Sequence, residues 1–376
     1  MLTSLRLNPN LLKVPLYIAG KSIEEVQEEY GLDDVLKLAS NESALGPSPL
    51  AIEAAQRVLW DSHRYPGSAD RNLRRRLAPT LHPNFDEHYL IIGNGATDII
   101  RMLAQAFVFD GGEMITSRVT FPMYHIAATM FGGVPVLVPP TSDLRFDLRA
   151  MAEAIKPNTR LIFVCSPNNP TGMICQRAEV EQFMRRVPAE VVVVFDESYR
   201  DFVADPDYPD PCDYVDDGRN VIVVRSFSKS AGLANLRVGY AIARPEMIEY
   251  LSHAQIPFNT GALALEAARA SLDDHEYLER IRRLVCEERE FLYHALDGLD
   301  LAYTRSHANF VMIPDLPLEA NRLSEKLIRS GVIVRPMAAW GMPTAIRVTI
   351  GLREHNERFI AALGAALADG NGTSKQ

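Results

Sequence analysis

Short apolar runs rich in β-branched residues recur through the first two thirds of the chain, and amphipathic stretches separate them. Several runs are apolar without alternation, which is typical of strands buried on both faces of a mostly parallel sheet. The pattern predicts seven strands, which are YLIIG at 89, EMITS at 113, PVLVP at 135, LIFVC at 161, VVVVF at 191, VIVVR at 221 and VGYAIA at 238. We therefore expect an α/β fold class, with a large domain whose seven-stranded, mostly parallel sheet is flanked by helices.

The pattern changes after Pro257, where long helical stretches begin. The segments ALALEAARASL and HEYLERIRRLVCEEREFLYHAL precede short strands in FVMIP, GVIVRP and AIRVTI, a helix around LSEKLIRS and a closing helix. This order predicts a second, smaller α+β domain. The N-terminal segment is too short to form a domain alone. We therefore expect residues 45–262 to form the large domain, and residues 1–44 and 263–376 to form the small one together.

Composition narrows the possible functions. The 376-residue chain is 47% hydrophobic and 23% charged, as expected for a globular enzyme with a substantial core. Its formal net charge of −9 argues against general affinity for nucleic acids or anionic membranes. No apolar run approaches the roughly 20 residues of a spanning helix, and the N-terminus lacks signal-peptide features, so we expect a cytoplasmic protein. The four cysteines form no C-x-x-C pair, which predicts reduced thiols and no metal site.

The first candidate site is the segment SFSKSAGLANLRVGY at 226–240, which follows a predicted strand. It holds one lysine, Lys229, whose amine can form a Schiff base with an aldehyde cofactor if desolvation or nearby positive charge keeps part of it neutral. Ser226, Ser228 and Arg237 would then suit a phosphate, with hydroxyl donors and a forked cation. A surface turn with an incidental lysine would also account for this segment alone.

A second candidate site lies in VVVVFDESYRDF, where Asp196 ends an apolar strand and Tyr199 follows three residues later. In open α/β sheets, ligands bind at the carboxyl ends of the strands. An aspartate there can keep the pyridine nitrogen of a cofactor protonated, and Tyr199 can donate a hydrogen bond to the phenolic oxygen of the ring. A nucleotide hydrolase also carries such a strand. That alternative lacks a phosphate loop, because the only Gly-Lys-Ser, at 20–22, has Pro15 where the leading glycine should stand.

Two further strand-to-helix turns carry candidate residues. The segment GNGATD at 93–98 begins like a dinucleotide fingerprint but ends in aspartate. The backbone amides of Ala96 and Thr97, at the start of a predicted helix, would form a phosphate site. The segment SPNNPTG at 166–172 follows the strand LIFVC and presents an asparagine amide, that of Asn169, at a strand end.

Taken in order, these segments resemble the fold type I aminotransferases of class I and II that depend on pyridoxal 5'-phosphate (PLP), and within them the histidinol-phosphate aminotransferase group. The resemblance covers nearly the whole chain. It rests on GKSIEEVQEEYGLDDVLKLASNES, ALGPSP, RYPG, GNGATDII, SPNNPTG, DESYRDF, SFSKSAGLANLRVGY, IPFNTGALA, SHANFVMI and GVIVRPM with IRVTIG. The chain departs from the group at Asn41–Ala44, at Asn235 and at Ser166.

The resemblance implies a role for each cofactor residue. Lys229 would be the catalytic residue, which anchors PLP and moves the proton between the substrate α-carbon and the cofactor. Asp196 would pair with the ring nitrogen, Tyr199 and Asn169 would hydrogen-bond the phenolic oxygen, and Phe121 of TFPMY would stack on the ring or else be an ordinary core phenylalanine. The phosphate would contact Ala96, Thr97, Ser226, Ser228, Arg237 and, from the partner subunit of a homodimer, Tyr65 of RYPG.

The resemblance also implies a substrate. Arg347 of IRVTIG would face the α-carboxylate, or the phosphate when histidinol phosphate is bound. Arg335 and Tyr17 match further phosphate contacts, although each could be a surface or salt-bridge residue. We expect a transaminase of amino-acid and histidine biosynthesis, with histidinol phosphate or an aromatic amino acid as donor and 2-oxoglutarate as acceptor. The alternatives are a PLP-dependent decarboxylase of the threonine-phosphate type and, from another class, an ATP-hydrolysing protein.

Overall fold

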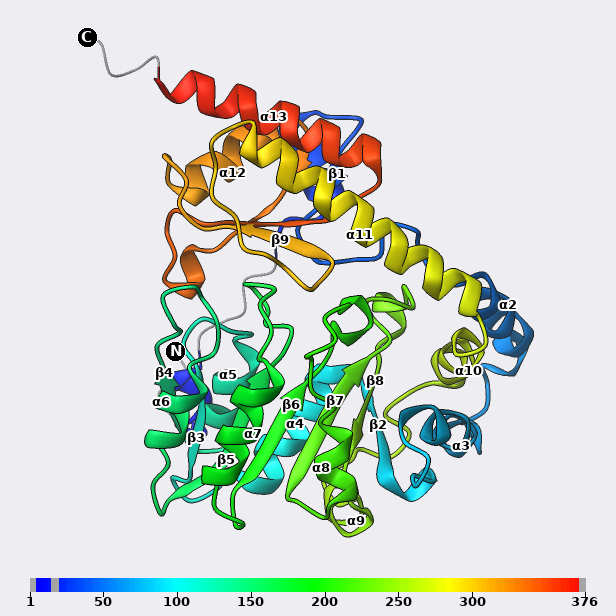
Figure 1. The fold of residues 1–376 in the computed structure, drawn as a ribbon. Coiled ribbons are helices and arrows are strands. Elements are labelled where there is room, and N and C mark those ends of the chain that lie inside the picture. The colour runs from blue at the N-terminus through cyan, green and yellow to red at the C-terminus, as the bar shows by residue number, and fades with distance from the viewer. Residues whose placement is uncertain (1–4, 15–19, 372–376) are drawn as a thin grey trace.

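The computed structural model describes residues 5–14 and 20–371. Its central feature is a seven-stranded sheet with the order β2-β8-β7-β6-β5-β3-β4 (Figure 1). The strands are β2 (Leu90–Asn94), β3 (Glu113–Ser117), β4 (Val134–Val138), β5 (Thr159–Cys165), β6 (Val192–Asp196), β7 (Val221–Ser226) and β8 (Val238–Ile242). Only β8 runs antiparallel to its neighbours. The predicted seven-stranded, mostly parallel sheet is confirmed.

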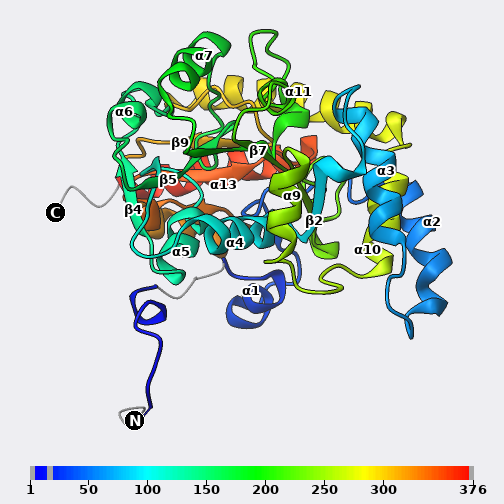
Figure 2. The ribbon, with the colours of Figure 1, turned by 90° about the horizontal axis from the view of Figure 1, so that it is seen from below.

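Helices cover both faces of this sheet, which explains why its strands carry continuous apolar runs. All five residues of β6 are buried. Figure 2 shows α4 (Ala96–Phe107) and α5 (Met123–Met130) on one face, and α6 (Leu148–Glu153) and α7 (Arg177–Arg186) on the other. Two more helices pack on this sheet, namely α8 (Cys212–Asp216) against β7 and α9 (Pro245–Ser252) against β2 and α4. Beside β2, α2 (Pro49–Val58), α3 (Ala69–Leu81) and α10 (Ala262–Ser271) pack together (Figure 1).

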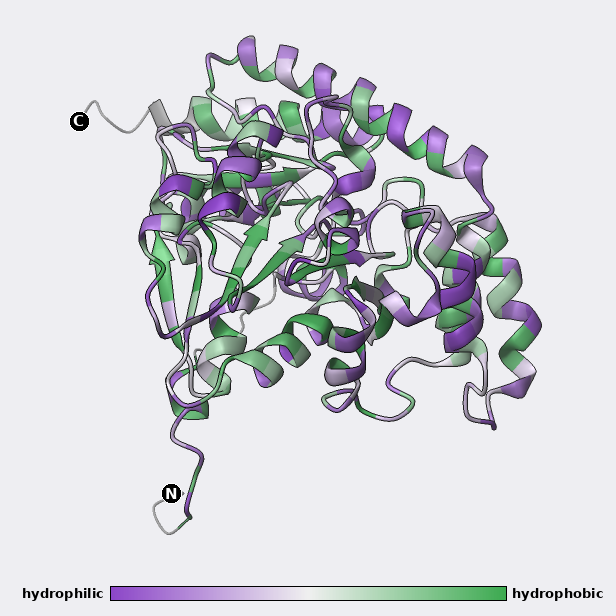
Figure 3. Ribbon diagram, turned by 60° about the horizontal axis from the view of Figure 1, so that its bottom comes forward, coloured by the Kyte–Doolittle hydropathy of each residue, from purple (hydrophilic) through white to green (hydrophobic). Residues whose placement is uncertain are grey.

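A second hydrophobic core lies beyond the strand ends, around a three-stranded antiparallel sheet with the order β11-β12-β9. Its elements are β9 (Phe310–Ile313), β11 (Arg335–Pro336), β12 (Ile346–Thr349), α11 (His275–Asp297), α12 (Ala320–Arg329) and α13 (Arg353–Asn371). Hydrophilic and hydrophobic residues recur along the long helix α11, whereas the central strands are mainly hydrophobic (Figure 3), and the buried residues Ile281, Val285 and Leu292 of α11 follow helical spacing. One face of α11 therefore meets this core and the other faces solvent.

The N-terminal segment joins this second core. The strand β1 (Leu36–Lys37) pairs in parallel with β10 (Val332–Ile333), and α1 (Ile23–Tyr30) packs through Val26 beside them.

Six short 3-10 helices complete the described elements, and they are η1 (Leu11–Lys13), η2 (Leu59–Asp61), η3 (Glu87–Tyr89), η4 (Arg200–Phe202), η5 (Ala234–Leu236) and η6 (Ala338–Trp340). The domain limits at residues 45 and 262 stay a prediction. Within the described ranges, every helix is too short or too polar to cross a membrane.

Candidate active site

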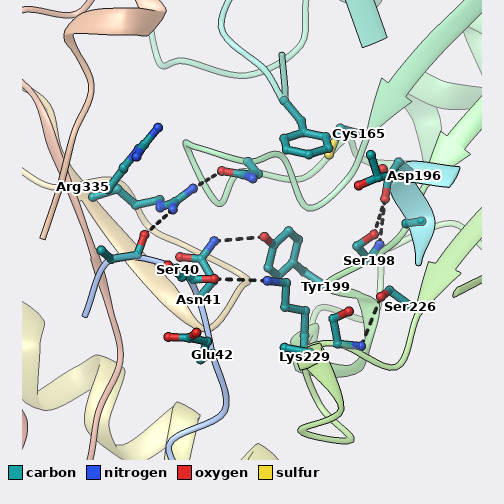
Figure 4. Close-up of a pocket in the computed structure, with 18 of the residues that line it drawn as sticks. Ser40, Asn41, Glu42, Cys165, Asp196, Ser198, Tyr199, Ser226, Lys229 and Arg335 are labelled. Atoms are coloured by element: carbon teal, nitrogen blue, oxygen red, sulfur yellow. Dashed lines mark hydrogen bonds between the residues drawn. The ribbon is translucent and has the colours of Figure 1, made fainter. Parts of the chain in front are cut away.

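A cavity of about 390 Å³ lies between the carboxyl ends of the central strands and the three-stranded sheet. Figure 4 shows side chains from both sides pointing into it. Most of the predicted site residues line this cavity, and they are Ala96, Thr97, Phe121, Asn169, Asp196, Tyr199, Ser226, Ser228, Lys229, Arg237, Arg335 and Arg347. The fold therefore brings together residues that lie up to 251 positions apart in the chain, between Ala96 and Arg347 (347 minus 96).

Lys229 lies in the turn after β7 and is half-buried in the cavity wall. Its Nζ donates a hydrogen bond to the backbone carbonyl of Ser40 at 3.3 Å, and lies 5.6 Å from the centre of the Tyr199 ring (Figure 4). Burial lowers the pKa of the Lys229 amine to about 8, and the positive charge of Arg347 contributes. A fraction of this amine is therefore neutral near neutral pH, which is the form that can attack an aldehyde.

Asp196, the last residue of β6, is buried at the inner end of the cavity. The Tyr124 hydroxyl donates to its Oδ2 at 2.8 Å, while the backbone N–H and the hydroxyl of Ser198 donate to Oδ1 at 3.0 and 2.6 Å. Burial raises the pKa of Asp196, and these hydrogen bonds oppose the rise. A buried carboxylate with three donors is well placed to receive a cationic partner such as a protonated ring nitrogen.

Tyr124 and Ser198 were not among the predicted residues. Tyr124 closes the TFPMY stretch and lies one helical turn after Phe121, whose ring meets the Tyr124 ring edge-on at 5.8 Å. A hydroxyl-bearing ring next to the predicted stacking position is the one signal in the sequence that points to it. Ser198 follows Asp196 by two residues, the spacing at which an aspartate accepts hydrogen bonds from the following turn.

The N-terminus of α4 and the segment after β7 form a cradle for an anion. The first N–H groups of a helix have no partner within the helix, and the residue before α4 is Gly95, which has no side chain to cap them. Ala96 and Thr97 line the cavity at these first positions of α4, where N–H groups have no acceptor within the helix. On the other side, Arg237 donates from Nη1 to the Ser228 hydroxyl at 3.4 Å. This donor set suits a phosphate group.

Two glycines allow the two halves of the cradle to approach each other. Gly95 has φ +77°, and a Cβ there would overlap Nη2 of Arg237. A Cβ at Gly239 of β8 would overlap the backbone nitrogen of Ala96. The arginine and the helix N-terminus can share one anion only because both positions lack a side chain.

Tyr199 and Asn41 meet at the side of the cavity. The Asn41 amide donates to the Tyr199 hydroxyl at 2.9 Å, and both residues are buried. Burial raises the pKa of Tyr199 to about 12, so its hydroxyl keeps its proton and can donate it in turn. Asn41 was noted from the sequence only as a departure from the family pattern, and its contact with Tyr199 spans 158 positions.

Two arginines face the cavity from the three-stranded sheet. Arg335 of β11 and Arg347 of β12 are directly opposed across an antiparallel strand pair. Arg347 is buried, and its guanidinium donates to the Asn169 side chain and, at 2.8 Å, to the Ala39 carbonyl. Like charges in opposed positions cost stability unless an anion compensates them. The pair therefore fits a negatively charged group on a bound molecule.

One predicted residue does not line the cavity in the single chain, and another lies outside the described residues. Tyr65 is 77% exposed and stacks on Phe258 at a ring distance of 4.5 Å. Tyr17 lies outside the described residues. Within the described part of the chain, no group of three or more acidic, histidine or cysteine side chains could hold a metal ion.

Comparison with known proteins identifies the class to which this fold and site belong. Residues 33–363 match the model of the family described as aminotransferase class I and II, and the chain belongs to that family. It is thus a transaminase of the PLP-dependent class.

Within this family, the chain is similar to several histidinol-phosphate aminotransferases. The chain is 44% identical to a histidinol-phosphate aminotransferase of Moorella thermoacetica, over 95% of this chain and 92% of the relative. It is 41% identical to histidinol-phosphate aminotransferase 2 of Pseudomonas aeruginosa, over 96% and 97% of the two chains. Among solved structures, the histidinol-phosphate aminotransferase of Sinorhizobium meliloti in complex with PLP superposes with a TM-score of 0.88 at 24% identity, covering 97% of this chain and 98% of that one. At this identity the structural match establishes the fold.

Proposed function

We propose that this transaminase holds PLP in the cavity and exchanges amino groups between histidinol phosphate and 2-oxoglutarate. The observation that carries the proposal is that four charged residues line one cavity. These are Lys229, whose pKa is lowered, the buried Asp196, and the two arginines of the three-stranded sheet. Two of the relatives named above carry the name histidinol-phosphate aminotransferase, which supports this donor.

The residues present fit the cofactor at each of its polar groups. The cradle of Ala96, Thr97, Ser226, Ser228 and Arg237 suits its phosphate. In the same way Asp196 suits the ring nitrogen, while Tyr199 and Asn169 suit the phenolic oxygen and Phe121 offers an aromatic face for the ring. When bound, PLP supplies an electron-withdrawing ring that stabilises negative charge at the substrate α-carbon.

Lys229 acts as the acid-base catalyst in this proposal. With a pKa of about 8, its Nζ can accept a proton from the substrate α-carbon and release it again near neutral pH. Asp196 keeps negative charge beside the ring nitrogen, since the Tyr124 and Ser198 donors favour the ionised carboxylate. The Tyr199 hydroxyl, protonated at neutral pH, orients the ring from the side.

The opposed arginines favour a doubly charged donor. A single guanidinium binds a planar α-carboxylate through two parallel hydrogen bonds. A phosphate monoester carries more charge and three acceptor oxygens, so it can engage Arg335 and Arg347 together. Histidinol phosphate is therefore the first candidate donor, and an aromatic amino acid that uses Arg347 alone is the second.

A donor panel tests this proposal. Holoenzyme is assayed with 2-oxoglutarate and histidinol phosphate, histidinol, phenylalanine or tyrosine, and glutamate formation is measured. We expect histidinol phosphate to exceed histidinol in kcat/KM by about 100-fold, because histidinol has the same ring and amine but lacks the phosphate. Equal values would contradict the donor assignment. A separate incubation with threonine phosphate tests the alternative, because carbon dioxide released there without glutamate would instead indicate a decarboxylase.

We also propose a homodimer in which Tyr65 completes the phosphate cradle of the partner subunit. In the single chain Tyr65 is exposed and stacks on Phe258, which is 60% exposed, and Trp60, five positions earlier in the chain, is 89% exposed. Large exposed aromatic side chains in one region are typical of a protein–protein interface. The aromatic cluster therefore supports a subunit contact here.

Subunit complementation tests the shared site. Lys229→Ala and Tyr65→Ala subunits are each assayed alone and after subunit exchange. If Tyr65 serves the partner's site, each mixed dimer contains one complete site, and the mixture should regain about a quarter of wild-type activity. No gain on mixing, or full activity of Tyr65→Ala alone, would contradict the proposal.

A further inference from the structure

Trp340 lines the cavity but was not among the predicted site residues. Trp340 ends η6, the short helix between β11 and β12, so it lies between the strands that carry Arg335 and Arg347. Its side chain is half-buried and lines the cavity. A tryptophan in this connection therefore touches the anion-binding side of the site.

A hydrogen bond fixes the indole in place. Its Nε1–H donates to the backbone carbonyl of Thr120 at 2.8 Å, across 220 positions of the chain. Thr120 immediately precedes Phe121, the residue proposed to stack on the cofactor ring. The hydrogen bond therefore joins the connection between the arginine strands to the loop beside the cofactor seat. A tryptophan N–H that has found such a partner holds its ring in one orientation.

The fixed ring supports Arg335. The Arg335 guanidinium carbon lies 5.4 Å from the centre of the Trp340 ring, within the range of a cation–π interaction. Arg335 is a long side chain with many rotamers, and the Arg347 charge directly across the strand pair repels it. The indole face counters both effects, because it attracts the cation and limits its freedom.

We propose that Trp340 is a positioning residue that sets the preference for a phosphate-bearing donor, by holding Arg335 beside Arg347. The inference rests on the proposed function. A donor whose anion is a phosphate uses both guanidinium groups, whereas an α-carboxylate is satisfied by Arg347 alone. Loss of the indole face therefore weakens binding of the phosphate-bearing donor more than binding of the amino acid.

The test compares two substitutions on two donors. W340L removes the aromatic face, while W340F keeps a smaller aromatic face and loses the N–H donor together with the second ring. For W340L we expect the ratio of kcat/KM for histidinol phosphate to kcat/KM for phenylalanine to fall about 3- to 30-fold, mainly through KM. For W340F we expect this ratio to lie between the values of W340L and the wild type. Equal losses for both donors, or an unchanged ratio, would overturn the inference.

A double-mutant cycle tests whether Trp340 acts through Arg335. In an R335Q background the indole has no cation to hold, so adding W340L should change the donor ratio less than about twofold. The same loss in both backgrounds would show that Trp340 does not work through Arg335, and would overturn the inference.

Inorganic phosphate separates this inference from the proposed function. Its inhibition constant, measured on the holoenzyme with phenylalanine as donor, reports the arginine pair without turnover of histidinol phosphate. We expect W340L to raise that constant severalfold, and an unchanged constant would overturn the role of Trp340. Absence of histidinol phosphate turnover by the wild type would overturn the proposed donor alone.

Discussion

The amine of Lys229 should titrate far below an ordinary lysine, because it is desolvated and lies near Arg347. With a pKa of about 8, its neutral fraction rises about tenfold between pH 7 and pH 9 and then levels off. An ordinary lysine, with a pKa near 10.4, would gain about 100-fold over the same interval and about sevenfold more by pH 10. The two cases therefore differ most clearly above pH 9.

The rate at which apo-protein combines with PLP measures this neutral fraction. Stopped-flow absorbance gives the second-order rate constant at each pH, and a free lysine derivative measured in parallel corrects for ionisations of PLP itself. We expect the corrected rate to follow one ionisation near pH 8 and to be flat above about pH 9. A rate that continues to climb through pH 10 would refute the assignment of a desolvated amine.

Two substitutions should move this ionisation in opposite directions. The Arg347 charge lowers the pKa of Lys229, whereas the Glu42 charge raises it. Arg347→Gln should therefore shift the rate profile to higher pH, and Glu42→Gln should shift it to lower pH. If both variants shifted the rate profile in the same direction, the charges of Arg347 and Glu42 would not be the cause of the lowered or raised pKa of Lys229.

Three further substitutions test other parts of the structure. Gly95→Ala should weaken PLP binding about 10- to 100-fold in an equilibrium titration, because its Cβ displaces Arg237 from the phosphate cradle. Gly218→Ala is the control, since Gly218 has a similar φ but no atom within 4 Å of the added Cβ, and this variant should bind PLP as tightly as the wild type. Asp196→Asn should lower kcat by about 100-fold or more, since it removes the charge beside the ring nitrogen, and a kcat within tenfold of wild type would argue against that role. Phe359→Ala should lower the free energy of unfolding by about 3–5 kcal/mol in urea denaturation, because the ring is fully buried in the second core.

The strand pattern of the sequence was sufficient to predict the central sheet. Strands covered by helices on both faces must be apolar at nearly every position, and this leaves runs such as VVVVF that are visible without any structure. The candidate cofactor residues were equally visible, because Asp196 ends one of these strands and Lys229 comes three residues after the end of another. Parallel strands place their carboxyl ends at one edge, so residues that follow them come together.

The partners of those residues could not be predicted in this way. Tyr124 contacts Asp196 across 72 positions, and Trp340 contacts the Thr120 carbonyl across 220. Periodicity describes neighbours within one element, and it carries no information about which separate elements meet. The Tyr124 contact depends on how α5 packs against the central sheet, and the Trp340 contact depends on how the three-stranded sheet lies over the central strand ends.

Local patterns in the chain were enough to predict the seven-stranded sheet, the lysine and aspartate at its strand ends, and the family to which they belong. The pairing of Arg335 with Arg347 beside Trp340, and the contact of Tyr124 with Asp196, became known from the folded structure. Local patterns record which residues must be buried, whereas the charge and hydrogen-bond environment of a site arises from segments that meet when the chain has folded.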